Sequence, residues 1–107
     1  MPQQQKTRRQ TLEEVVSSNP ENAFARYGLA MECVNAGEDK VAREHFHKLL
    51  SMHPDYLAAY YHYGLLLKRM GHPKEAREVL RAGVTVARRA GNDHARSELE
   101  AAFDELS

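Results

Sequence analysis

The chain has 107 residues, a length that fits one small domain, and its fifteen Lys and Arg residues balance its fifteen Asp and Glu residues. A molecule without net charge has no overall field that would concentrate it on nucleic acid or an anionic membrane, so we expect neither as a partner. A single cysteine excludes an intramolecular disulfide, and the sequence has no secretory signal in its first ten residues and no membrane-length apolar run, which together favour a cytoplasmic protein.

Apolar residues recur at helical spacing along the whole chain, and no stretch alternates as a strand would. In residues 1–20 this spacing predicts a first helix, with Thr11 and Glu14 as its expected capping residues. The following helices are expected near residues 21–35, 39–52, 56–70 and 73–89, and a last one in residues 92–107. Gly37 and Gly71 are expected to end the second and fourth helices, because helix ends favour residues that adopt positive φ.

The same residues occur twice at a spacing of 34 positions. The pairs that align without a gap are Pro20 and Pro54, Tyr27 and Tyr61, Gly37 and Gly71, Lys40 and Lys74, Ala42 and Ala76, Arg43 and Arg77, and Glu44 and Glu78. Self-similarity at a fixed period of this size is typical of stacked helical repeats. One period earlier, Leu12, Val15, Val16 and Pro20 correspond to Phe46, Leu49, Leu50 and Pro54. The N-terminal segment is therefore expected to be the second helix of an incomplete repeat.

This pattern resembles the tetratricopeptide repeat (TPR), a helix-turn-helix unit of 34 residues. Residues 23–56 match its motif at Leu29, Ala30, Gly37, Ala42, Phe46 and Pro54, and residues 57–90 match it at Tyr60, Tyr63, Gly64, Leu67, Gly71, Ala76 and Leu80. The sequence departs from the family at Arg26, where Trp is usual, at Cys33, where Tyr is usual, and at Arg88, where Pro is usual. The missing Pro predicts only a longer helix at that point.

The resemblance implies an all-α fold, a right-handed solenoid of about six helices that forms one TPR domain over residues 1–107. In this reading residues 1–20 supply a half repeat, residues 23–56 and 57–90 supply two complete repeats, and residues 92–107 supply a C-terminal capping helix with a polar outer face. About three repeats are needed for a continuous core. The N-terminal half repeat and the C-terminal capping helix add the packing surface that two complete repeats lack.

The first helix of each repeat carries more apolar residues than packing requires. Beside the packing stripe of Leu29, Ala30 and Cys33 lies a second stripe, and the resemblance implies that this stripe lines a concave face that holds an extended peptide or a partner helix. The expected partner-binding residues are Phe24, Tyr27, Met31, Val34, Tyr61, Leu65, Lys68 and Arg69. The alternative is that the stripe is core, covered by the N-terminal helix or a neighbouring loop.

The type of partner is narrowed by the residues in this stripe. Some TPR domains clamp a terminal carboxylate with Lys and Asn, but Tyr27 and Met31 stand where those polar groups are expected, so we do not expect that ligand. An apolar, aromatic groove with Lys68 and Arg69 at one end predicts a hydrophobic segment with an acidic flank. The same surface equally suits a second copy of the chain, and a homodimer is the alternative function.

Charge is distributed unevenly along the C-terminal half. Residues 68–89 contain seven basic and two acidic residues, whereas residues 93–107 contain five acidic residues and one Arg. We expect these charges to neutralise one another within the fold or between copies, and not to bind nucleic acid. Lys40 with Glu44, and Lys74 with Glu78, have the spacing of ion pairs on a solvated helix face.

The sequence offers no catalytic or metal-binding motif. None of the six histidines has another three or four residues away, and His45 and His47 point to different sides of a helix. Cys33 lies in the packing stripe, where a buried thiol is expected to be inert. Neither a phosphate-binding glycine loop nor a nucleophile elbow is present. We therefore expect no enzyme activity, no cofactor and no metal, but a protein-interaction module whose partner is a protein or peptide.

Overall fold

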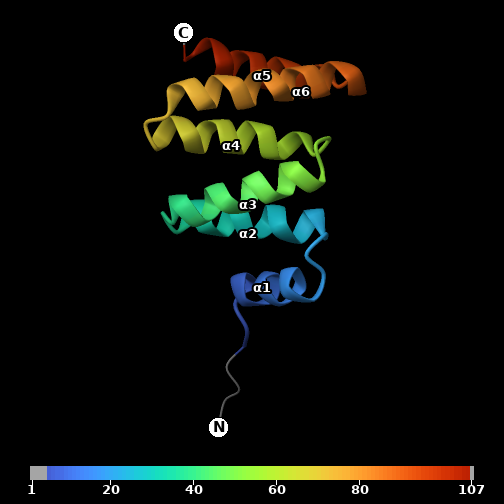
Figure 1. Ribbon diagram of the computed structural model, residues 1–107, viewed down its shortest axis with the longest axis vertical. Helices are drawn as coiled ribbons and strands as arrows, with labels where there is room; N and C mark the ends of the chain where they lie inside the picture. The colour runs from blue at the N-terminus through green and yellow to red at the C-terminus, as the bar shows by residue number, and fades with distance from the viewer. Residues whose placement is uncertain (1–4, 107) are drawn as a thin grey trace.

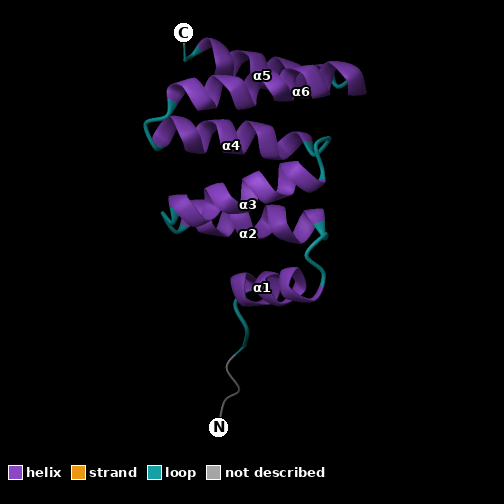
Figure 2. Ribbon diagram, viewed as in Figure 1, coloured by secondary structure: helices purple, strands orange, loops and turns teal. Residues whose placement is uncertain are grey.

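The computed structural model describes residues 5–106, and these form an elongated stack of α-helices without a strand (Figure 1; Figure 2). The helices are α1 (Arg8–Ser18), α2 (Ala23–Asn35), α3 (Asp39–Met52), α4 (Leu57–Arg69), α5 (Pro73–Ala90) and α6 (Asp93–Asp104). The predicted all-α helical-repeat fold is confirmed, and the bounds of α2 to α5 agree with the expected ones to within two residues. Helices α1 and α6 lie at opposite ends of the stack, which is 55 Å long and 21 Å thick.

The N-terminal end of α1 differs from the sequence prediction. Thr7 caps this helix: its Oγ1 accepts from the Gln10 amide at 3.1 Å, and the Gln10 side chain accepts from the Thr7 amide at 2.9 Å. The prediction of Thr11 and Glu14 as caps was wrong. Thr7 and Gln10 form the same type of capping box one turn earlier, so Thr11 lies inside the helix.

The other helix ends follow their local sequence. Asn22 caps α2 by accepting from the Ala25 amide at 2.9 Å, and Asn92 caps α6 in the same way at 3.0 Å. Gly37 and Gly71 follow α2 and α4 with φ values of 75° and 83°, as expected for residues that end a helix in the left-handed region. Two polar caps and two glycines therefore fix the boundaries between successive helices.

The main hydrophobic core joins α2, α3, α4 and α5. Phe46 of α3 is fully buried and stacks on Tyr63 of α4, with ring centroids 5.6 Å apart and ring planes 16° apart. The remaining buried residues of this core are Ala30, Cys33, Ala42, Leu49, Ala59, Leu66, Leu67 and Ala76. The alanines allow the helix backbones to approach closely, while the large side chains fill the space between repeats.

Gly64 marks the closest approach between α4 and α5. A Cβ atom added there would lie 2.4 Å from Leu80 Cδ2 and 2.6 Å from Leu80 Cγ, and Leu80 is itself buried. We expect Gly64→Ala to lower the free energy of unfolding, because an overpacking cost of about 1–3 kcal/mol opposes a helix-propensity gain of about 1 kcal/mol.

Urea unfolding followed by circular dichroism measures this effect. Gly28→Ala is the matched control, because its added Cβ would meet the Leu12 methyl groups at 3.2 Å and Arg8 Nη2 at 3.6 Å, which are the ends of side chains. Equal stability of the two variants would contradict the tight contact at Gly64.

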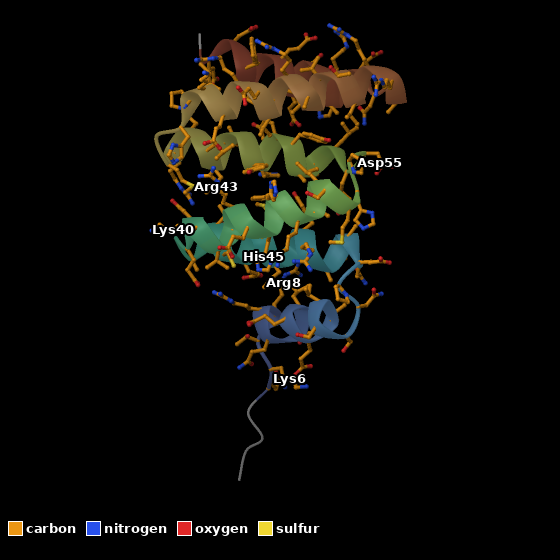
Figure 3. All side chains as sticks on the ribbon, in the orientation of Figure 1. Lys6, Arg8, Lys40, Arg43, His45 and Asp55 are labelled. Carbon is orange, nitrogen blue, oxygen red and sulfur yellow. The ribbon has the colours of Figure 1, made fainter. Side chains whose placement is uncertain are left out.

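Helix α1 packs on one side of α2. Leu12 forms a small buried cluster with Ala25 and Leu29, and two ion pairs reinforce it. Arg8 Nε lies 3.0 Å from Glu32 Oε1, and Arg9 forms a two-pronged ion pair with Glu38 (Figure 3). This side of α2 is thus occupied by α1, and the stripe that begins at Phe24 is on another side.

Candidate functional site

Helices α2, α4 and α6 are the first members of successive helix pairs and meet along one side of the stack. Tyr27 of α2 reaches Tyr56 and His62 at the start of α4, and Tyr61 of α4 packs against a buried cluster to which α6 contributes Leu99 and Ala102. We call this surface the first-helix face. Its residues are Phe24, Tyr27, Met31 and Val34 of α2, Tyr61, His62, Leu65 and Lys68 of α4, Glu98 of α6, and Glu105 directly after α6. The face brings together seven of the eight residues that the sequence predicted for partner binding.

Exposure differs along the first-helix face. Phe24 is 70% exposed, more than any other large apolar residue described by the structure, and Leu65 is 36% exposed. Tyr27, Met31 and Val34 are half-buried and pack partly against the main core. Helix α1 leaves Phe24 uncovered, since it packs on the side of α2 that carries Ala25 and Leu29. The alternative that the stripe is core applies in part to the half-buried residues and not to Phe24.

Two aromatic side chains join the predicted residues. The ring of Tyr27 lies 5.3 Å from the ring of Tyr56 and 6.0 Å from that of His62, and His62 makes an edge contact with Tyr61 at 5.3 Å. These four rings form a continuous aromatic row across α2 and α4. The sequence analysis missed Tyr56 and His62. Tyr56 lies before the first residue of α4, so the helical spacing of apolar residues does not include it. His62 directly follows Tyr61, and neighbouring residues of a helix point in different directions.

Burial sets the protonation of the aromatic row. Burial raises the pKa of the Tyr27 phenol, and the neighbouring Tyr56 raises it further. Burial also raises the pKa of Tyr56. Burial lowers the pKa of His62 against the opposing effect of the Glu98 carboxylate. At neutral pH the rings of Tyr27, Tyr56 and His62 are therefore uncharged.

Both cations predicted for this surface have partners within the chain. Lys68 Nζ lies 3.7 Å from Glu105 Oε2 of the segment after α6. Arg69 forms an ion pair with Asp39 and donates a hydrogen bond to the Val34 carbonyl at 3.3 Å, which directs it toward the α2–α3 turn. Both cations thus have ion partners within the chain, while each side chain stays 49% exposed. The acidic flank of the partner remains a prediction.

Helices α3 and α5 form the opposite surface, which contains a groove of about 700 Å³. The groove is lined by Lys40, Arg43, Glu44, His47, Lys48, Tyr63, Met70, His72 and Glu75. Arg43 Nη2 lies 2.6 Å from Glu75 Oε2 and so links the two helices, while the predicted pairs Lys40 with Glu44 and Lys74 with Glu78 are not among the ion pairs of the described residues (Figure 3). Charges on this groove alternate in sign, as on a solvated surface.

One ion pair joins the basic helix α5 to the acidic helix α6 within the described residues: Arg88 lies 3.7 Å from Glu100. Two further Arg side chains of α5 reach the C-terminal segment, because Arg81 lies over the Phe103 ring at 5.4 Å and Arg77 donates to the Leu106 carbonyl at 2.9 Å. The predicted neutralisation of these charges therefore stays a prediction for the other residues.

Reactive and metal-binding groups are sparse in the described part of the chain. Residues 5–106 contain no group of three His, Cys, Asp or Glu side chains that could hold a metal ion. Burial raises the pKa of the Cys33 thiol, which keeps it protonated and unreactive. Over the same residues, no helix has the length and apolar character needed to cross a bilayer.

Comparison with known proteins decides the family of this helical stack. A tetratricopeptide repeat family model matches residues 36–101. The chain belongs to the TPR family. Domains of this family are in general non-catalytic modules that mediate protein–protein interactions, and comparison with curated proteins gave no match.

Solved structures with the same fold include other TPR proteins. The solution structure of a TPR domain protein from Salinibacter ruber is 34% identical and covers 82% of this chain and 89% of that chain, with a TM-score of 0.77. A protein from Bordetella parapertussis is 22% identical and covers 95% of this chain and 89% of its own, with a TM-score of 0.81. MamA is 21% identical and covers 92% of this chain and 60% of its own, with a TM-score of 0.72. The last two show the fold alone.

Proposed function

We propose that this TPR protein is a non-catalytic adaptor, active in the cytoplasm, that binds a peptide or helix of another protein on its first-helix face. The observation that carries the proposal is the exposure of Phe24 on α2 and Leu65 on α4, the two helices that a row of four aromatic rings connects. Exposed apolar side chains gathered on one surface are typical of interaction sites, and Tyr and Phe contribute much of the binding energy at such surfaces.

The structure also supports a largely preformed site. Tyr27 and Met31 pack on the main core, and Tyr61 packs on the cluster formed with α6, so their positions are held before any partner arrives. A rigid surface loses little conformational entropy on binding, which favours affinity. Phe24 and Leu65 then provide the exposed apolar contacts.

The proposal predicts that the double variant Phe24→Ser with Leu65→Ser loses partner binding and keeps its fold. Peptides selected from a random library against the wild-type protein should bind the variant at least about tenfold more weakly, because apolar contacts in a desolvated centre dominate binding. Fluorescence anisotropy with labelled peptides measures the dissociation constants, and circular dichroism checks the fold.

Val41→Ser is the matched control, since Val41 is 38% exposed, close to the exposed fraction of Leu65, but lies on α3 outside the first-helix face. We expect it to bind the selected peptides as the wild type does. Unchanged binding by the double variant would refute the assignment of this face.

A second copy of the chain could occupy the same face, and molar mass in solution distinguishes this use. We expect the mass to remain near 12.2 kDa across a wide concentration range in light scattering. A stable dimer that dissociates when Phe24 and Leu65 are replaced by Ser would assign the face to self-assembly instead.

A further inference from the structure

Resting on the proposed function, we propose that the bound segment carries an Arg or Lys side chain beside its apolar residues, and that this cation binds on the first-helix face next to Tyr61, His62 and Glu98. The partner is thus an apolar segment with a basic flank. The sequence analysis expected an acidic flank, and this proposal expects the opposite charge.

The position of Glu98 follows from the packing of α6 against α4. Tyr61 and Ala95 both pack against a buried cluster to which α6 contributes Leu99 and Ala102. Glu98 is three residues after Ala95 and four before Ala102, so all three lie on one side of the helix. Glu105, seven residues after Glu98, lies 3.7 Å from Lys68, and Lys68 is itself seven residues after Tyr61. The opposing effect of the Glu98 carboxylate on the pKa of His62 agrees with this placement. The aromatic row therefore ends beside a carboxylate.

The ion pairs of this face leave negative charge available. Lys68 is paired with Glu105, and Arg69 is directed toward Asp39. Within the described residues, the only basic group within 4.0 Å of Glu98 is His94, 3.8 Å away, and its ring is 90% exposed. A contact of this length between exposed side chains is weak, so Glu98 makes no strong ion pair within the described residues.

Aromatic faces next to a carboxylate favour a cation of the Arg or Lys type. The electron-rich faces of Tyr rings attract such groups, and Arg can also form two parallel hydrogen bonds to a carboxylate. The rings of Tyr61 and His62 meet edge to face, and both residues are only partly buried. An acidic flank would instead meet Glu98 and Glu105, and the one nearby cation, Lys68, is already engaged.

Three peptide pools test the proposal on the full-length protein. The pools share a centre randomised over Leu, Phe, Met, Ala and Ser and differ only in their flanking residues, which are Arg, Ser or Glu. We expect immobilised protein to retain the Arg pool about tenfold more than the Glu pool near neutral pH, with the Ser pool between them. Retention is measured by mass spectrometry of the eluted peptides.

Charge reversal at Glu98 should reverse this preference. Glu98→Lys is expected to favour the Glu pool, whereas Glu44→Lys, with the same change in net charge on the exposed surface of α3, should keep the wild-type order. A switch of preference in both variants would refute the local assignment to Glu98.

The remaining outcomes separate this inference from the proposed function. Equal retention of the three pools, lost when Phe24 and Leu65 are replaced by Ser, would refute the basic flank and leave the proposed function standing. Retention of no pool, or retention that survives this double replacement, would refute the proposed function and the inference together.

Discussion

Truncation of Phe46 to Ala should cost about 3–5 kcal/mol of the free energy of unfolding, the range typical of a fully buried Phe. Phe46 has no exposed surface, and its ring stacks on Tyr63 of the following repeat. The loss thus combines the transfer of a large apolar side chain, a cavity, and one contact between repeats. Because a small domain has a total stability of about 5–15 kcal/mol, this one substitution removes much of it.

Urea unfolding followed by circular dichroism measures this loss. Phe46→Leu keeps most of the side-chain volume and should cost much less, while Val41→Ala on the same helix changes a partly exposed residue and should stay within about 0.5 kcal/mol of the wild type. A cost below about 1 kcal/mol for Phe46→Ala would show that the contact between α3 and α4 is not central to the stack.

The 34-residue period predicted the fold well because it reports packing that repeats from unit to unit. Gly64, Ala42 and Ala76 recur where helices approach closely, and the structure buries all three. The first helix start was misplaced because two capping-box motifs follow one another in its sequence, Thr7 with Gln10 and Thr11 with Glu14, and only the first is used. When two capping motifs fit equally well, the packing of the helix in the fold decides which one caps it, and the local sequence does not.

The period predicts less about the candidate site because it is not exact at the C-terminal end. Helix α5 has 18 residues and α3 has 14, in line with the longer helix expected from the missing Pro. The residues before α4 and α6, Tyr56 and Asn92, are consequently 36 positions apart, where a strict period would give 34. Extrapolation by 34 residues therefore misplaces the side chains of α6, and Glu98 could not be assigned to the first-helix face.

The charges of the site depend on contacts between distant helices. Lys68 pairs with Glu105 and Arg69 with Asp39, which are 37 and 30 residues away. Helical spacing relates only residues three or four positions apart, so it cannot predict pairs between distant helices. The apolar members of the site were predictable from local spacing, but the net charge of the surface was not.

Arg26 is a buried cation without a carboxylate partner. Its side chain stands where the family usually has Trp, only 6% of the residue is exposed, and its Nε has no hydrogen-bond partner. Arg26 Nη1 lies 3.2 Å from His45 Nδ1, and Nη2 donates to the Pro20 carbonyl at 3.2 Å. A guanidinium can only donate, so His45 Nδ1 must accept, and protonation of His45 would place two cations in contact.

Replacing Arg26 with Met should therefore stabilise the protein, by about 1–4 kcal/mol, because a well-packed apolar side chain of similar length removes an uncompensated buried charge. Urea unfolding near neutral pH measures the change. Arg43→Met is the control, since Arg43 is partly exposed and paired with Glu75, and its replacement should give no gain. A loss of stability in Arg26→Met would show that the contacts to His45 and Pro20 outweigh the cost of burial.

The same variant should also reduce the acid sensitivity of the fold. Burial lowers the pKa of His45 below its usual 6.5, and Arg26 of α2, Lys48 of α3 and Arg9 of α1 lower it further against the opposing effect of Glu44. The contribution of a neutral His45 to stability is thus complete above about pH 6.5 and is lost as the pH falls below that value.

Arg26→Met removes the nearest cation, so the pKa of His45 should rise toward its usual value and stability should fall less between neutral and acidic pH. Unfolding of both proteins across this range tests the expectation. His47→Gln is the control, because His47 is exposed on the same helix and its loss should leave the acid sensitivity of the wild type intact. An equally steep loss in Arg26→Met would assign the acid sensitivity to another group, of which the half-buried His62 is the first to replace.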